Sequence, residues 1–149
     1  VPPFKPEKML MLGYGYGTVA ELTRKIWGDL SCTAVDLKEL QTYPQDKLII
    51  ADAFKWIEEE KEQYDYIAVD LFDGRQASSE ILTYPFLANV QRILTPKGLA
   101  SIHFVGGDIM TKENKELIER YFKVDRVKTV DTSWILFLKH KDNTTEYGI

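Results

Sequence analysis

Residues 8–20 read KMLMLGYGYGTVA, and this stretch decides the fold. An apolar run from Lys8 to Leu12 predicts a short buried strand, and residues from Thr18 to Trp27 have apolar side chains at helical spacing. Between them, glycines alternate with tyrosines. Glycine allows positive φ and leaves room for a ligand against the backbone, while the following helix offers unpaired N–H groups. The stretch therefore predicts a strand, a ligand-binding turn and a helix.

The rest of the chain repeats this alternation of strand and helix. Further strands are expected at 31–36, 47–51, 64–70 and 99–105, and further helices at 53–61, 79–94 and 112–122. Two last strands, 124–130 and 133–139, flank an Asp131-Thr132 turn and predict a hairpin. Such an order favours one three-layer α/β/α domain over residues 1–149, with a mostly parallel sheet closed by an antiparallel hairpin. We expect residues 1–7 and 141–149 to be flexible ends.

Composition excludes several kinds of partner. The 149 residues include 19 basic and 23 acidic side chains, a formal charge of −4, without a block of Lys or Arg. Such a chain is poorly suited to nucleic acid or anionic membranes. No apolar run approaches the ~18 residues of a membrane span, and no signal peptide is evident, so we expect a cytoplasmic protein. Cys32 is expected to be a buried thiol, and no side chains have metal-ligand spacing.

Acidic residues follow the predicted strands at the edge where a parallel sheet binds ligands. Asp36 ends the second strand, where a carboxylate can accept the two hydroxyls of a ribose. Gly15, Gly17 and Ala20 also satisfy the G-x-G-x-x-G/A pattern of dinucleotide-binding proteins, so the type of nucleotide stays open. Asp52 follows the third strand, where it could accept a hydrogen bond from an adenine amine, cap the next helix, or do both.

The end of the fourth strand, Asp70-Leu71-Phe72-Asp73-Gly74, carries two further acids. Paired carboxylates can bind an amine cation, and one can take its proton as the amine becomes a nucleophile. For Asp73, ordinary turn chemistry is an equal alternative. His103, near the end of the fifth strand, fits a structural residue better than a base, and His140 is expected to be solvated.

Taken together, the motifs LGYGYG, AVD, IADA, YDYIAVDLFDG and LTPKGLASIHF resemble the class I S-adenosylmethionine-dependent methyltransferases, within them the spermidine synthase-like branch. The resemblance implies a seven-stranded Rossmann-like sheet, without the N-terminal β-domain of spermidine synthases. It implies S-adenosylmethionine or its decarboxylated form as cofactor, and no metal. It also implies roles for these residues: Gly13, Gly15 and Gly17 at the methionine part and ribose, Asp36 at the ribose hydroxyls, Asp52 and Ala53 at the adenine, Asp70 as base, and Asp73 as its partner.

The tyrosines of the glycine loop are open to two interpretations. Tyr14 and Tyr16 either stack over the bound cofactor or pack over the edge of the sheet. Tyr16 also stands where spermidine synthases have an aspartate, which favours methyl transfer, whereas the pair Asp70 and Asp73 favours aminopropyl transfer.

Our leading hypothesis is a methyltransferase acting on a small-molecule acceptor, with an amine as one candidate acceptor and a homodimer as the candidate assembly. The alternatives are an aminopropyltransferase using decarboxylated S-adenosylmethionine, a non-catalytic cofactor-binding protein, and a nicotinamide-binding domain.

Overall fold

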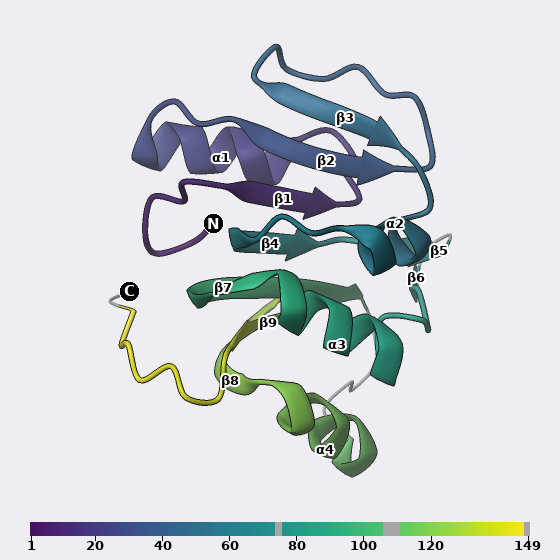
Figure 1. The fold of residues 1–149 in the computed structure, drawn as a ribbon, viewed down its shortest axis with the longest axis vertical. Coiled ribbons are helices and arrows are strands. Elements are labelled where there is room, and N and C mark those ends of the chain that lie inside the picture. The colour runs from purple at the N-terminus through teal and green to yellow at the C-terminus, as the bar shows by residue number, and fades with distance from the viewer. Residues whose placement is uncertain (74–75, 106–110, 148–149) are drawn as a thin grey trace.

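The computed structural model describes residues 1–73, 76–105 and 111–147, which form a seven-stranded sheet with helices on both faces (Figure 1). The strands are β1 (Met9–Leu12), β2 (Cys32–Asp36), β3 (Asp46–Ile50), β4 (Tyr64–Val69), β7 (Leu94–Val105), β8 (Lys123–Val130) and β9 (Ser133–Lys139). The helices are α1 (Thr18–Trp27), α2 (Ala53–Glu59), α3 (Tyr84–Ile93) and α4 (Lys112–Tyr121). A small hairpin of β5 (Phe72–Asp73) and β6 (Gln76–Ala77) stands apart.

Strand order confirms the predicted topology. The sheet runs β3-β2-β1-β4-β7-β9-β8, and β9 is antiparallel to both of its neighbours, while the first five strands are parallel. Each crossover connection leads from the end of one parallel strand back to the start of the next, so all these strands end at the same edge of the sheet. The carboxyl ends of β1, β2, β3 and β4 therefore lie side by side, and the loops that follow them share one end of the molecule.

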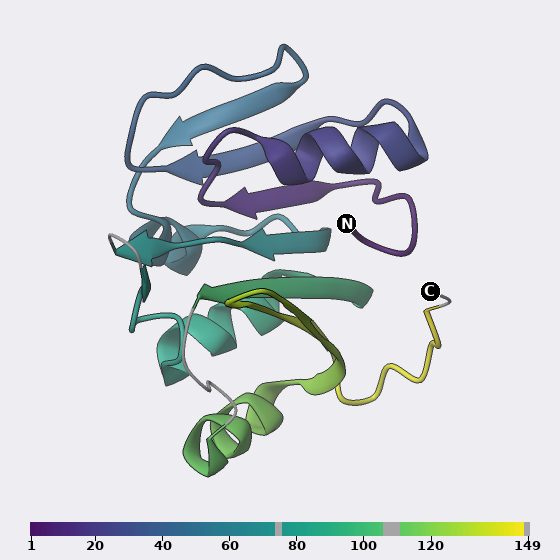
Figure 2. The same cartoon turned by 180° about the vertical axis from the view of Figure 1, so that it is seen from behind.

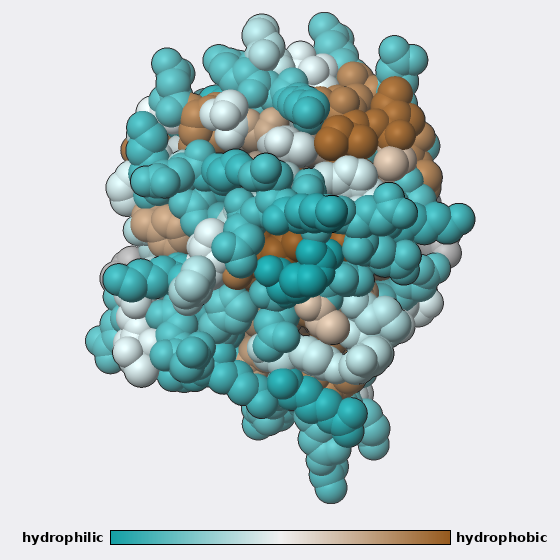
Figure 3. All heavy atoms as spheres, viewed as in Figure 1, coloured by the Kyte–Doolittle hydropathy of each residue, from teal (hydrophilic) through white to brown (hydrophobic). Residues whose placement is uncertain are grey.

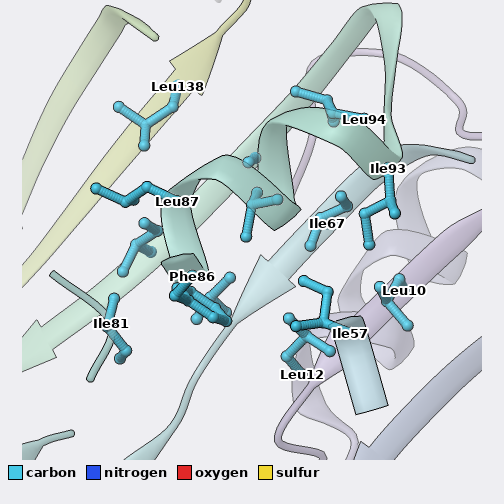
Figure 4. Close-up of a cluster of buried hydrophobic side chains, with 14 of the residues drawn as sticks. Leu10, Leu12, Ile57, Ile67, Ile81, Phe86, Leu87, Ile93, Leu94 and Leu138 are labelled. Carbon is cyan, nitrogen blue, oxygen red and sulfur yellow. The ribbon is translucent and has the colours of Figure 1, made fainter. Parts of the chain in front are cut away.

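The two faces of the sheet are buried against different helices, as the front and back views show (Figure 1, Figure 2). Successive residues of a strand point to opposite faces. Accordingly, Leu10 and Leu12 of β1 pack in the core with α2, α3 and α4 (Figure 4), whereas Met9 and Met11 pack with Ala20 of α1. A fully apolar β1 is thus explained by burial on both sides.

Two element starts differ from the sequence-based prediction by five residues (84 − 79 and 99 − 94), while the other bounds differ by two residues or fewer. The long helix begins at Tyr84 and not at Ser79, because Pro85 occupies the first turn and Thr83 has an extended backbone. The fifth parallel strand begins at Leu94 and not at Leu99. Leu94 already pairs with Tyr64, and the turn-like residues 95–98 are accommodated as an irregularity within the strand pairing.

Both chain ends, for which we expected flexibility, make specific contacts with the domain. The backbone N–H groups of Glu7 and Lys8 donate to the Asp65 carboxylate at 2.7 and 2.9 Å. Near the other end, the ring of Tyr147 lies 5.5 Å from the ring of Phe4. The two ends therefore pack together on the α1 side of the sheet.

Three buried ionisable groups, two tyrosine hydroxyls and one thiol, should make the protein less stable in strong alkali. Burial raises the pKa of Tyr66 and of Tyr14 from 10.0 to about 12, and the pKa of the Cys32 thiol from 9.0 to about 12. The folded chain holds these protons at pH values where the unfolded chain has lost them. Stability is therefore fully present below about pH 9 and is lost as the pH rises toward about 12. Urea unfolding at a series of pH values across this range should show the free energy of unfolding falling as the pH rises. In Tyr66→Phe this free energy should fall less steeply with pH, because one of the three groups is gone. An equally steep fall in that variant would contradict a contribution from Tyr66.

Candidate functional site

A cavity of about 600 Å³ opens where the loops after β1, β2, β3 and β4 meet. Its size suits a nucleoside-containing cofactor, because pockets for such ligands span ~300–1,000 Å³. Six of the residues predicted from the sequence line it: Gly13, Gly15, Asp36, Asp52, Ala53 and Asp70. The structure thus brings together residues that are up to 57 positions apart in the chain (70 − 13).

The three glycines of the loop have three different functions. Gly13 has φ +86°, and a Cβ there would lie 2.1 Å from the Asp70 carbonyl oxygen, so this glycine allows β1 and β4 to approach. Gly17 begins α1, and its Cβ would lie 2.4 Å from the Tyr14 hydroxyl. Only Gly15, with φ +58°, faces open space beside the cavity. The close approach of a ligand is therefore to be expected at Gly15.

Tyr14 does not place its ring in the cavity, contrary to a stacking function. The side chain is 2% exposed and packs on the α1 side of the sheet. Its hydroxyl donates to Asp46 Oδ2 at 2.6 Å, and Arg24 pairs with the other oxygen of that carboxylate. Of the two alternatives for Tyr14, packing is the one that the structure supports. The Tyr14 side chain therefore supports the glycine loop from the α1 side of the sheet.

Asp36 is held in place by backbone groups. Its Oδ2 accepts from the N–H of Tyr14 at 2.9 Å, and its Oδ1 accepts from the N–H of Lys38 at 3.0 Å. A carboxylate oxygen can accept more than one hydrogen bond, so both oxygens keep capacity for a ligand. The carboxylate is thereby fixed at the cavity wall, with acceptor capacity left on both oxygens.

Asp52 is the N-cap of α2. Its Oδ1 accepts from the N–H of Phe54 at 2.9 Å, which confirms the capping interpretation. Asp52 and the neighbouring Ala53 also line the cavity. A cap and a ligand contact are compatible, because the cap uses only one of the two carboxylate oxygens.

Asp70 lines the cavity and directly follows β4. Its N–H donates to the Leu12 carbonyl at 2.8 Å, and its side chain is 38% exposed. Asp70 Oδ1 lies 3.1 Å from Nδ1 of His103, a contact that the sequence did not reveal. Asp73, its predicted partner, ends β5, but its side chain lies outside the described part of the chain.

Several lining residues were not predicted from the sequence. Leu37 and Lys38 follow Asp36, Phe72 follows Asp70, and Phe54 and Glu80 also line the cavity. Apolar surface gathers at the upper right of the molecule, around β3 (Figure 3). Leu37, which follows β2 and lines the cavity, is 72% exposed. Such a side chain offers an apolar surface to a flat ring. For Leu37 and Lys38 the available signal was their position directly after β2, whereas Phe54 lies within α2 and Glu80 lies in the loop before α3.

His140 is not simply solvated, since its Nε2 lies 2.9 Å from the Leu94 carbonyl oxygen. Within residues 1–73, 76–105 and 111–147, no three His, Cys, Asp or Glu side chains gather as metal ligands. In the same part of the chain, no helix has the length and apolar character needed to cross a bilayer.

Fold and cavity together define the class to which this chain belongs, a Rossmann-like methyltransferase fold with a nucleoside-sized pocket at the carboxyl ends of its strands. A structure of human methyltransferase-like protein 13 in complex with SAH superposes with a TM-score of 0.77 at 20% identity, covering 93% of this chain and 74% of that one. Spermidine synthase from Thermotoga maritima superposes with a TM-score of 0.70 at 18% identity, covering 94% and 56%. At such identities the likeness concerns the fold.

Sequence comparison narrows the class to one family. The pattern of the spermine/spermidine synthase domain matches residues 17–141, so the chain belongs to this family. A polyamine aminopropyltransferase of Korarchaeum cryptofilum is 26% identical over 136 residues, which are 81% of this chain. The chain spans only 41% of the length of that relative.

Proposed function

We propose that this chain is the donor-binding domain of an aminopropyltransferase, with decarboxylated S-adenosylmethionine in the cavity and an amine as acceptor. Family membership supports aminopropyl transfer over the methyl transfer that the glycine loop first favoured. The charge of the cavity is the observation that carries the proposal.

Acids outnumber bases around the cavity. Among the described lining residues, Asp36, Asp52, Asp70 and Glu80 carry negative charge, and Lys38 carries positive charge. Intact S-adenosylmethionine has a carboxylate that these acids repel. Its decarboxylated form has only cationic groups at that end, so the same acids attract it. An amine acceptor is also a cation at neutral pH, and the field of the cavity favours its approach.

Asp70 would hold the acceptor and accept its proton. The donor supplies a carbon that is activated by the neighbouring positive sulfur. The acceptor ammonium must lose one proton before its nitrogen lone pair can form the new N–C bond, and the electrons of the broken C–S bond remain on sulfur. A carboxylate that lines the cavity and is 38% exposed can bind the ammonium and take that proton. The glycine loop and Asp36 would contribute by alignment of the donor.

Calorimetric titration with intact and decarboxylated S-adenosylmethionine tests the proposal. We expect the decarboxylated form to bind at least about tenfold more tightly, because the intact form brings a carboxylate into an acidic cavity. Asp65→Asn, a change of an acid outside the cavity lining, serves as control and should preserve the preference. Equal binding of the two forms would contradict the proposal.

Methyl transfer is the second candidate, because of one residue. Tyr16 lines the cavity, is 93% exposed, and stands where the resemblance to spermidine synthases expects an aspartate that contacts the aminopropyl amine. Tighter binding of the intact cofactor in the same titration would favour this candidate.

A further inference from the structure

We propose that His103 is a positioning residue for Asp70, and that its protonation weakens the binding of the cationic acceptor. The inference rests on the proposed function, since it concerns the amine that Asp70 would hold. Neither the family match nor the resemblance assigns a function to a histidine at this position.

The pairing of β4 with β7 explains why the two side chains meet. Val69 and Ile102 are partners in the parallel register, so the next residues, Asp70 and His103, are neighbours at the same edge of the sheet. The Nδ1–Oδ1 distance of 3.1 Å is a hydrogen bond. An ionised carboxylate only accepts, so the neutral imidazole must carry its proton on Nδ1.

Other contacts hold the imidazole in this orientation. The ring of Phe72 lies 5.2 Å from the ring of His103, edge to face. Ile135 of β9 is the register partner of His103 on its other side. Among the described residues, Asp70 is the charged side chain within ion-pair distance of the His103 imidazole. Both members of the pair remain about one third exposed, 32% for His103 and 38% for Asp70.

Two consequences follow from this geometry. A hydrogen bond from neutral His103 occupies Asp70 Oδ1 and fixes the rotamer, so Oδ2 is left for the acceptor. When His103 takes up a second proton, the imidazolium neutralises the field of the carboxylate and repels an ammonium nearby. Imidazoles change charge between roughly pH 5 and 8, so acceptor binding should strengthen as the pH rises through this range.

The test measures binding of 1,4-diaminobutane by calorimetry in the presence of saturating 5′-methylthioadenosine, at about pH 5.5 and about pH 8. We expect the wild-type affinity to rise about three- to tenfold with pH. The glutamine of His103→Gln can still donate a hydrogen bond but cannot be protonated. The affinity of this variant for 1,4-diaminobutane should therefore change less than about twofold between the two pH values. His140→Gln, a change outside the cavity lining, should behave as wild type. A wild-type affinity independent of pH, or absent diamine binding, overturns the proposal.

NMR spectroscopy separates this inference from the proposed function. The chain has two histidines, so His103→Gln and His140→Gln each remove one imidazole signal and assign the other. In the ligand-free protein at about pH 8, Asp70→Asn should shift the ring signals of His103, because a charged hydrogen-bond acceptor of Nδ1 is replaced by a neutral amide. Unchanged His103 ring signals in this variant overturn the pairing. Failure of 5′-methylthioadenosine to bind, with the NMR shift present, would instead overturn the proposed function.

Discussion

Asp70→Asn is expected to lower the rate of aminopropyl transfer by about 10²- to 10⁴-fold, the range for loss of a general base. The amide has the shape of the carboxylate and can still accept from His103, but it cannot take the proton of the acceptor amine. Turnover is measured as release of the thioether product from decarboxylated S-adenosylmethionine and a diamine. Binding of 5′-methylthioadenosine should stay within about threefold of wild type, since Asp36 and Asp52 bind the nucleoside in our proposal.

Asp65→Asn is the matched control for this experiment. Asp65 lies near the start of β4, whereas Asp70 directly follows its end, and the Asp65 carboxylate accepts from the backbone N–H groups of Glu7 and Lys8. Its replacement should leave the rate within about twofold of wild type. Unchanged turnover in Asp70→Asn would remove this carboxylate from the mechanism and leave cofactor binding as the function of the cavity.

The sequence was sufficient to predict the cavity because of the geometry of parallel sheets. Once the alternation of strand and helix was established, the residues after each strand had to meet at one edge. Asp36, Asp52 and Asp70 were chosen for that position alone, and all three line the cavity. The glycine loop was equally predictable, since a turn with positive φ between a strand and a helix requires glycine.

Side-chain direction was not predictable in the same way. Nothing local tells whether Tyr14 points over the ligand or beneath the sheet. The direction of the Tyr14 side chain depends on Asp46, 32 residues away, which accepts a hydrogen bond from the Tyr14 hydroxyl. His103 was expected to be structural and not a base, and its contact with Asp70, 33 residues away, becomes visible only when the register of β4 and β7 is known. Long-range register and long-range polar contacts, which sequence periodicity does not encode, account for both results.

The second large effect is expected at the buried cluster beneath the glycine loop. The Asp46 side chain is fully buried, it accepts from the Tyr14 hydroxyl, and it pairs with Arg24, whose side chain is 12% exposed. In Asp46→Ala, the guanidinium is left without its partner in an apolar environment. We expect the free energy of unfolding to fall by about 3–5 kcal/mol, as for other broken buried pairs. Urea unfolding at neutral pH, followed by circular dichroism, measures this loss.

Glu62→Ala is the control, because Glu62 pairs with Lys8 at the surface, where the two side chains are 65% and 53% exposed. Exposed pairs contribute little, so the loss should stay below about 1 kcal/mol. A similar small loss in Asp46→Ala would mean that water reaches Arg24 and that the cluster does not hold the loop.

If the large loss is found, Tyr14→Phe should weaken 5′-methylthioadenosine binding while the protein stays folded. The hydroxyl connects the glycine loop to Asp46, and the N–H of the same residue positions the Asp36 carboxylate.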